Sequence, residues 1–249
     1  MLGGVGLSVL ALLATAWSWQ RSLPLKRVVV SGTVHSDSAD VVRFAAVERD
    51  STTTLFSIDP DLVADRVRRA PWVRNASIRR RPSGTLSIRV EEREPVVLVI
   101  GSDGRPVSYL DAEGYSMPLV EGALYDVPLL RGQTARQQPN QPIENESTLE
   151  LLVALSEIDM QTDALISEVH VDSRGRVELR MSPGAGHESI PVELGAADFK
   201  TKFERLYTFW RQAVLTRPER DFQSIDLRFD GQVVTRESME ENIPNPQMP

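Results

Sequence analysis

Cysteine is absent from the 249-residue chain, and histidine occurs only three times. The lack of cysteine excludes disulfides, thiol nucleophiles and cysteine-ligated zinc or iron–sulfur sites, and it leaves the redox compartment open. His35, His170 and His187 show no metal-ligand spacing, and none lies in an HExxH motif. The sequence also lacks a GxxxxGK[ST] phosphate loop and a GxSxG nucleophile motif. These absences leave no assembled catalytic or metal centre.

Positive charge is in deficit: the chain has 28 Lys and Arg residues against 35 Asp and Glu residues, so its formal net charge is −7. A nucleic-acid ligand would meet a repulsive field, and only Trp72 lies close enough to the arginines to stack a base. Glu91 and Glu92 would point to opposite faces of a strand, so they do not converge as an acid–base pair. We predict a non-enzymatic protein without cofactor, nucleic-acid partner or small-molecule substrate.

Charge is missing altogether from residues 2–19, where the sequence reads LGGVGLSVLALLATAWSW. At about 1.5 Å per helical residue, this apolar run spans most of a ~30 Å hydrocarbon core. Trp17 and Trp19 lie where interfacial aromatic residues are expected. We predict a transmembrane segment over residues 1–20.

A cleaved signal peptide is the alternative interpretation of the apolar run, because Ala14-Thr15-Ala16 resembles a cleavage site. Against it, no basic residue precedes the run. Arg21 and Lys26 follow the run, and the positive-inside rule alone would place them in the cytoplasm. A basic tail before Met1 would reconcile these charges with an exported body.

Residues 25–93 carry the pattern of a small α+β unit. LKRVVVSG is typical of a strand, and SADVVRFAAVERD is typical of an amphipathic helix. In the next helix, Asp59 is the expected cap, Pro60 suits the first turn and Pro71 forbids continuation. After a turn at residues 82–84, apolar residues alternate with polar ones as in a half-buried strand. The predicted order is strand, helix, helix, strand, strand.

From Pro95 onward, short strands separated by turn signals predict a mostly antiparallel sheet. The predicted strands cover residues 96–100, 107–110, 124–130, 166–171, 177–181 and 190–194. Helices are expected over residues 148–160 and 197–215, with their apolar faces in the core. We predict this β domain over residues 94–237, followed by a disordered acidic tail over residues 238–249.

The last hairpin surrounds Asp230-Gly231, a pair that favours a two-residue primed turn. Residues 225–229 and 232–236 are the predicted strands on either side of this turn. As the last strand of the chain, residues 232–236 are expected at a sheet edge. An edge presents unpaired backbone groups, so it accepts a strand from a partner.

Arginines are concentrated between residues 66 and 81. A solvated face is the simplest interpretation, and a docking surface for an acidic partner or for anionic lipid headgroups is the alternative. The candidate docking face comprises Arg68, Arg69, Trp72, Arg74 and Arg79.

Taken in order, these segments resemble the FtsQ/DivIB family of bacterial cell-division proteins over nearly the whole chain. After the apolar run, they read LKRVVVSG, LFSIDPDLVADRVRRAPWVRNASIRRRPSGTLSIRVEEREPVVL, YLDAEGYSM, DVPLLRG, VELGAADFKTKFERL and SIDLRFDGQVVTR. The resemblance implies an α+β fold with an N-terminal transmembrane helix, a POTRA domain over residues 25–93 and a mostly antiparallel β domain with two helices. It also implies a single-pass type II protein of the cell (inner) membrane, extracytoplasmic at the division septum.

The resemblance further implies a divisome scaffold that links early and late division proteins. Such a scaffold binds FtsB- and FtsL-like proteins by β-strand addition and, through them, influences the septal peptidoglycan synthases FtsW and FtsI. By position, the implied partner site comprises Arg228, Phe229, Gly231, Gln232, Val233 and Val234. The chain departs from the family pattern in a turn one residue shorter and in lacking a tryptophan after Val234.

Two other functions compete with this hypothesis. A POTRA domain also suits a component of outer-membrane assembly or secretion, but such proteins need many further membrane strands after Arg93. A cell-wall hydrolase would need a nucleophile, a metal site or an acid–base pair, and the sequence assembles none of these.

Overall fold

The structure, a computed structural model, describes residues 22–48, 53–132, 140–182, 188–217 and 222–237, and the single residues 10 and 15. Met1–Glu94 and Pro95–Pro249 form two units, each with its own hydrophobic core. The predicted transmembrane segment and the predicted disordered tail lie outside the described residues, apart from residues 10 and 15. Within the described ranges, no helix has both the length and the apolar character needed to cross a membrane.

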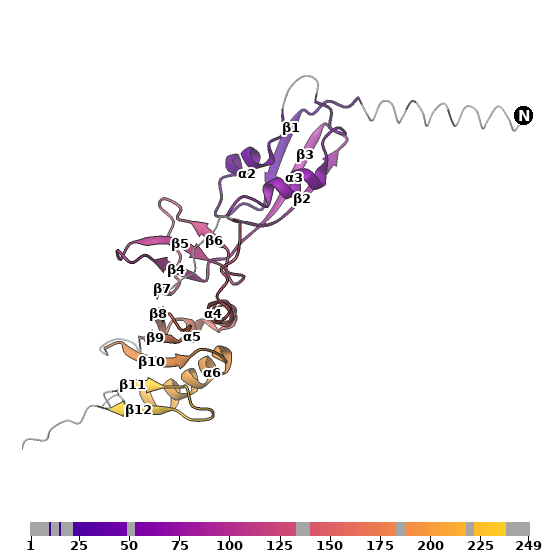
Figure 1. The fold of residues 1–249 in the computed structure, drawn as a ribbon. Helices are drawn as coiled ribbons and strands as arrows, with labels where there is room; N and C mark the ends of the chain where they lie inside the picture. The colour runs from indigo at the N-terminus through magenta and orange to yellow at the C-terminus, as the bar shows by residue number, and fades with distance from the viewer. Residues whose placement is uncertain are drawn as a thin grey trace, which may run out of the picture. The chain divides into compact units, whose positions relative to one another are not determined.

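The described part of the first unit is a three-stranded sheet with two helices packed on one face (Figure 1). In chain order its elements are β1 (Arg27–Ser31), α2 (Ser38–Ala45), α3 (Pro60–Val67), β2 (Val73–Arg81) and β3 (Thr85–Glu92). The central strand, β3, runs parallel to β1 and antiparallel to β2. This order of elements confirms the sequence prediction for the unit.

The predicted cap begins α3. The Asp59 carboxylate accepts hydrogen bonds from the backbone N–H groups of Asp61 and Leu62, and Pro60 occupies the first turn, where no N–H is needed. The helices and strands enclose one core, to which both α3 and β3 contribute apolar side chains. Its fully buried members include Val41, Ala45, Leu55, Val67, Val73, Leu86 and Ile88.

Glu92, at the end of β3, ties the loop between β1 and α2 to the sheet. Its carboxylate accepts N–H hydrogen bonds from Val34 (2.8 Å), His35 (2.7 Å) and Ser36 (2.9 Å), and another from the Ser36 hydroxyl. Desolvation by burial raises the pKa of Glu92, but these hydrogen bonds outweigh it, so the pKa lies below its ordinary value. The ionised form of Glu92 therefore stabilises this corner of the unit.

The described part of the second unit is built on a nine-stranded sheet with the order β12-β11-β10-β9-β8-β7-β4-β5-β6. Antiparallel pairing predominates, although β4 with β7, β7 with β8 and β10 with β11 pair in parallel. The strands are β4 (Val97–Ile100), β5 (Pro106–Leu110), β6 (Ser116–Pro118), β7 (Leu129–Gly132), β8 (Ile166–Val171), β9 (Val177–Met181), β10 (Ile190–Gly195), β11 (Phe222–Asp226) and β12 (Val234–Glu237).

Helices α4 (Glu146–Glu157), α5 (Met160–Asp163) and α6 (Phe199–Phe209) lie along one side of this sheet (Figure 1). A π-helical turn, η1 (Trp210–Val214), continues α6. The apolar face predicted for this helix packs into the core through buried side chains, namely Phe199, Phe203, Leu206 and Val214.

Before the last hairpin, two predicted elements of the second unit are partly wrong. The strand predicted over residues 124–130 is reduced to β7, because Leu124 is 91% exposed and pairing with β4 begins only at Leu129. The helix predicted over residues 148–160 ends at Glu157. The helix ends there because Ile158 has an extended backbone. Asp159 then accepts hydrogen bonds from the N–H groups of Gln161 and Thr162 and so begins a separate helix, α5.

Candidate functional site

The candidate partner-binding site lies at the C-terminal end of the nine-stranded sheet, where β12 is the outermost strand. β12 pairs with β11 in an antiparallel register that joins Ile225 to Thr235 and Asp226 to Val234. On its other side, no strand within the described ranges pairs with β12. The last strand therefore lies at a sheet edge, as predicted, and its outer backbone groups suit the addition of a strand.

The predicted two-residue turn at Asp230-Gly231 is wrong. The β11–β12 ladder begins only at the Asp226–Val234 pair, so residues 227–233 form the connection. Asp230-Gly231 lies in a turn within this connection, where the Gln232 N–H donates to the Phe229 oxygen at 3.3 Å. Gly231 has a φ of 67°, whereas Asp230 does not have a positive φ. The turn is thus not a primed type, which requires a positive φ at the first central residue.

Leu227 explains the longer connection. Its side chain is fully buried, and its N–H donates to the Glu193 oxygen of β10 at 2.9 Å. The chain after Asp226 therefore follows β10 instead of turning back at once toward β12. The strand predicted over residues 225–229 is therefore wrong beyond Asp226, because β11 covers Phe222–Asp226.

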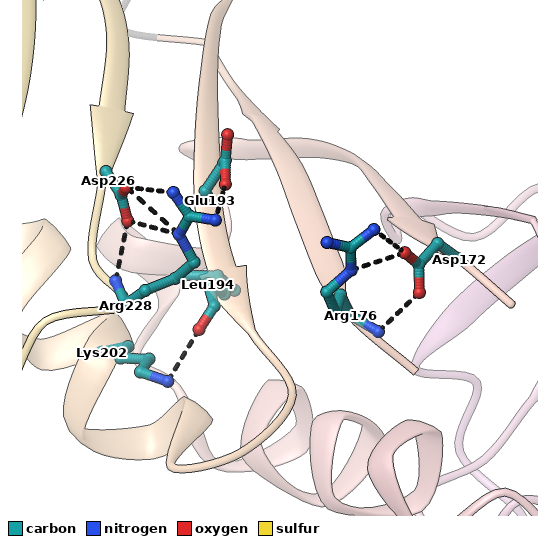
Figure 2. A network of polar contacts seen from close by, with 7 residues as sticks. All are labelled: Asp172, Arg176, Glu193, Leu194, Lys202, Asp226 and Arg228. Carbon is teal, nitrogen blue, oxygen red and sulfur yellow. Dashed lines mark hydrogen bonds and ion pairs between the residues drawn. The ribbon is translucent and has the colours of Figure 1, made fainter. Parts of the chain in front are cut away.

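Figure 2 shows the Arg228 guanidinium between carboxylates of two neighbouring strands. Asp226 accepts hydrogen bonds from Arg228 Nε (3.0 Å), Nη2 (2.6 Å) and backbone N–H (3.0 Å), and Glu193 forms an ion pair with Nη1 at 2.8 Å. Since Glu193 and Asp226 are cross-strand neighbours, Arg228 relieves the repulsion between them. The side-chain hydrogen bond between Arg228 and Asp226 lowers the pKa of Asp226 and raises the pKa of Arg228.

Two basic side chains of α6 hold the backbone around the site. Arg205 Nη1 donates to the main-chain oxygens of Phe229 (2.8 Å) and Gln232 (3.3 Å). Lys202 is buried, and its Nζ donates to the Leu194 oxygen at 2.7 Å (Figure 2). Neither residue was predicted as part of the site. The position of Lys202 within the apolar face of the helix is a usable signal, whereas Arg205 contacts residues 24 and 27 positions away and shows no local pattern.

The exposed apolar side chains at this edge are Phe229, which is 52% exposed, and Val234, which is 46% exposed. Val233 is half-buried and packs against the core instead. Gly231 and Gln232 are exposed in the connection. Of the predicted partner-site residues, only Val234 belongs to the edge strand, and the others lie in residues 227–233.

The arginines of the predicted docking face lie on different surfaces. Arg68 and Arg69 follow the last turn of α3, on the helical side of the first unit. Arg74 and Arg79 are exposed on β2. Trp72 is only 5% exposed, so its ring belongs to the interior. The structure therefore does not bring these five residues together.

A shallow hollow of about 270 Å³ lies beside the Arg228 network. Its Asp172 and Arg176 form an ion pair at 2.7 Å (Figure 2). Hydrogen bonds from the backbone and side chain of Arg176 lower the pKa of Asp172. Within the described ranges, no group of three or more His, Asp or Glu residues is placed to hold a metal ion. The polar contacts between Asp172 and Arg176 are therefore those of a local turn at the surface, and they do not indicate a ligand site.

Comparisons with known proteins cover both units. Residues 94–236 match the family model "FtsQ/DivIB, C-terminal related", and residues 23–93 match "POTRA domain, FtsQ-type". A protein of Rhodothermus marinus named "Cell division protein FtsQ" is 48% identical over 232 residues, which are 93% of this chain and 84% of that protein. The protein of the same name from Salinibacter ruber is 38% identical over 92% of this chain and 88% of its own length. A third, from Geotalea daltonii, is 26% identical over 85% of this chain and 75% of its own length.

Proposed function

Because the chain belongs to the FtsQ/DivIB family of cell-division proteins, we propose that it is a non-enzymatic divisome scaffold anchored in the cell membrane. The apolar run at residues 2–19 is its single type II span, and both units lie outside the cytoplasm at the septum. The units act as a POTRA domain over residues 25–93 and a β domain over residues 94–237. The FtsQ-type character of the POTRA match favours this role over outer-membrane assembly or secretion.

The partner in this proposal is an FtsB- or FtsL-like chain that adds a strand to β12 and connects the scaffold to FtsW- and FtsI-like synthases. One observation carries the proposal: β12 is the outermost strand of the sheet and has no strand on its outer side within the described ranges. Main-chain hydrogen bonds give such an interface a sequence-tolerant ladder, and exposed side chains give it selectivity. Phe229 and Val234 are the exposed apolar groups at this edge.

The contacts around residues 227–233 support the same proposal. Arg205 binds two main-chain oxygens of this connection, and Arg228 is held by Asp226 and Glu193. A connection fixed in this way loses little conformational entropy when a partner binds, so more of the contact energy appears as affinity. The role of Arg228 in this site is to order the connection, because its guanidinium already has partners within the chain.

A pair of proline substitutions tests the edge directly. Backbone N–H groups of successive strand residues point alternately toward and away from the neighbouring strand. Of Thr235→Pro and Arg236→Pro, one therefore removes a hydrogen bond to β11 and the other removes an outward donor. Thermal unfolding identifies them, because loss of the internal hydrogen bond lowers Tm more. The variant with nearly wild-type Tm should co-purify about tenfold less of the FtsB- and FtsL-like proteins encoded by the same genome.

The matched control for this test is Val107→Pro, which places a proline at an exposed position of β5, away from the β12 edge. Its partner yield should follow its Tm alone. If the proline variant of β12 that keeps its Tm also keeps the wild-type partner yield, strand addition at β12 is refuted.

A further inference from the structure

The side of the first unit's sheet that faces away from α2 and α3 carries a regular array of arginines. Alternate residues of β3 are buried against the helices, so the residues between them point to the other side. Three rows cross this side in the observed registers: Arg27, Thr85 and Arg81; Val29, Ser87 and Arg79; Ser31, Arg89 and Ser77. We call this set of residues the open face.

All the charges in these three rows are positive, although the chain as a whole has a net charge of −7. The next row on the same side joins Asn75 to the exposed Glu91, so the one described carboxylate of this side lies at the end away from Arg27. The ionisable residues of the open face are exposed arginines, namely Arg27, Arg79, Arg81 and Arg89. Arg27 Nε donates to the Thr85 hydroxyl at 3.0 Å. Among the acidic residues that the structure describes, none forms an ion pair with Arg79, Arg81 or Arg89. These guanidinium groups remain available to an external anion.

The open face begins close to the apolar run along the chain. Arg27 and Arg81 form its first row, at the beginning of β1. Residues 20–26 connect this row to the apolar run and reach at most about 25 Å when extended. A tether of that length lets the face touch the headgroups of a bilayer that holds the run. Contact is needed, because attraction between exposed charges decays over about 10 Å in ordinary salt.

We propose that the open face lies against anionic phospholipid headgroups of the membrane that anchors the chain. This inference rests on the anchoring in the proposed function. Guanidinium groups bind phosphate oxygens with paired N–H donors, and the three strands spread these groups over one side of the sheet, so that several headgroups can be bound at once. The uncharged positions carry small Ser and Thr side chains and one valine, Val29, which is 43% exposed. An acidic protein partner would instead favour a central apolar anchor in a pocket.

A single introduced cysteine tests the contact in the full chain, because the natural sequence has none. Ser77→Cys places a fluorophore on the open face, and Ala39→Cys places one on exposed α2. Each labelled chain is reconstituted in vesicles of phosphatidylcholine, with or without phosphatidylglycerol, that carry a headgroup quencher. We expect the fluorescence of the label at position 77 to be quenched only when phosphatidylglycerol is present, and high salt should reverse this quenching. The fluorescence of the label at position 39 should change little.

Two triple variants that remove the same number of positive charges distinguish the effect of the open face from the effect of the chain's total charge. Arg79→Gln, Arg81→Gln and Arg89→Gln together remove three charges from the open face, whereas Arg66→Gln, Arg68→Gln and Arg69→Gln remove three from the helical side. Each arginine near an anionic surface contributes about a fivefold factor to binding. The first triple variant should therefore lower the equilibrium constant for headgroup contact by about 100-fold, and the second should leave it within about threefold.

Several outcomes overturn the inference. Equal quenching with and without phosphatidylglycerol does so, as does quenching that survives the open-face triple variant. Unchanged quenching together with lower capture of the division partners assigns the face to a protein and also overturns it. Flotation with pure phosphatidylcholine vesicles tests the anchor separately. If the chain fails to float there, the proposed anchoring is wrong, and flotation with phosphatidylglycerol vesicles that depends on the open-face arginines still decides the inference.

Discussion

Arg205 on α6 donates a hydrogen bond from Nη1 to the main-chain oxygen of Phe229, at 2.8 Å. The same atom reaches the Gln232 oxygen at 3.3 Å, so one side chain holds both ends of the turn at Asp230-Gly231. This contact fixes the backbone at Phe229, whose ring is exposed, without using any contact of β12 itself. The geometry of the candidate site is therefore set partly by the helix layer.

Arg205→Gln should weaken partner binding more than it weakens the fold. Loss of hydrogen bonds to two exposed carbonyl oxygens should lower the free energy of unfolding by about 1 kcal/mol or less. Without Arg205, residues 227–233 are more mobile and lose more conformational entropy when the partner binds, so affinity should fall by about fivefold to twentyfold. Urea unfolding and titration with the partner measure the two effects. Arg211→Gln, an exposed arginine on η1, is the control, and equal affinity for both variants would contradict the ordering role of Arg205.

Arg228→Gln should make stability depend less on pH. In the native chain the hydrogen bond from Arg228 lowers the pKa of Asp226. That contribution is present above the unfolded pKa of about 3.9 and is lost as pH falls through the lower folded value. We expect the variant to be less stable by roughly 1 kcal/mol at neutral pH, with the difference shrinking below about pH 4.

A double variant separates this effect from general loss of packing. Asp226→Asn removes one of the two adjacent carboxylates, so Arg228→Gln should cost less in that background than in the native chain. Urea unfolding at several pH values measures all the variants. A constant cost of Arg228→Gln across pH and background would show that Arg228 acts through packing alone.

The sequence predicted the elements whose signals are local. Asp59 and Pro60 define the start of α3 by themselves, and the alternation around Ile88 reports a buried strand face without knowledge of its neighbours. The C-terminal connection was not predictable in this way. The Leu227 N–H donates a hydrogen bond to the Glu193 oxygen, and the Phe229 oxygen accepts one from Arg205. Both partners come from elements distant in sequence. A turn-favouring pair such as Asp230-Gly231 reports a local bend but not the strand register around it.

Gly132→Ala should destabilise the second unit severely. Gly132 ends β7 with a φ of 98°, and an added Cβ would lie 2.0 Å from the Val171 oxygen in β8. Backbone must move to remove this clash, so we expect a loss of more than about 3 kcal/mol. Gly104→Ala is the matched control, because its φ is 81° and nothing lies within 4 Å of the added Cβ. It should cost only about 1–2 kcal/mol, and equal costs by urea unfolding would contradict the clash.

Glu92→Gln should destabilise the first unit at neutral pH and leave it nearly unchanged in acid. The native carboxylate accepts hydrogen bonds from three backbone N–H groups and the Ser36 hydroxyl, and an amide presents an N–H₂ group to some of these donors. We expect a loss of about 1–3 kcal/mol. Because the folded pKa is lowered, the native contribution is present above the unfolded pKa of about 4.3 and is lost as pH falls through the folded value.

The neighbouring residue provides the control for this last prediction. Glu91 is exposed and points to the other side of β3, so Glu91→Gln should change the free energy of unfolding by less than about 0.5 kcal/mol. Unfolding of the full chain in urea, followed at neutral pH and near pH 3, compares the two variants with the native protein. Glu92→Gln and the native chain should converge in acid, because protonation has already removed the acceptor charge. If the difference in free energy of unfolding between Glu92→Gln and the native chain is as large near pH 3 as at neutral pH, then Glu92 stabilises the corner at Ser36 through its packing and not through its ionised carboxylate.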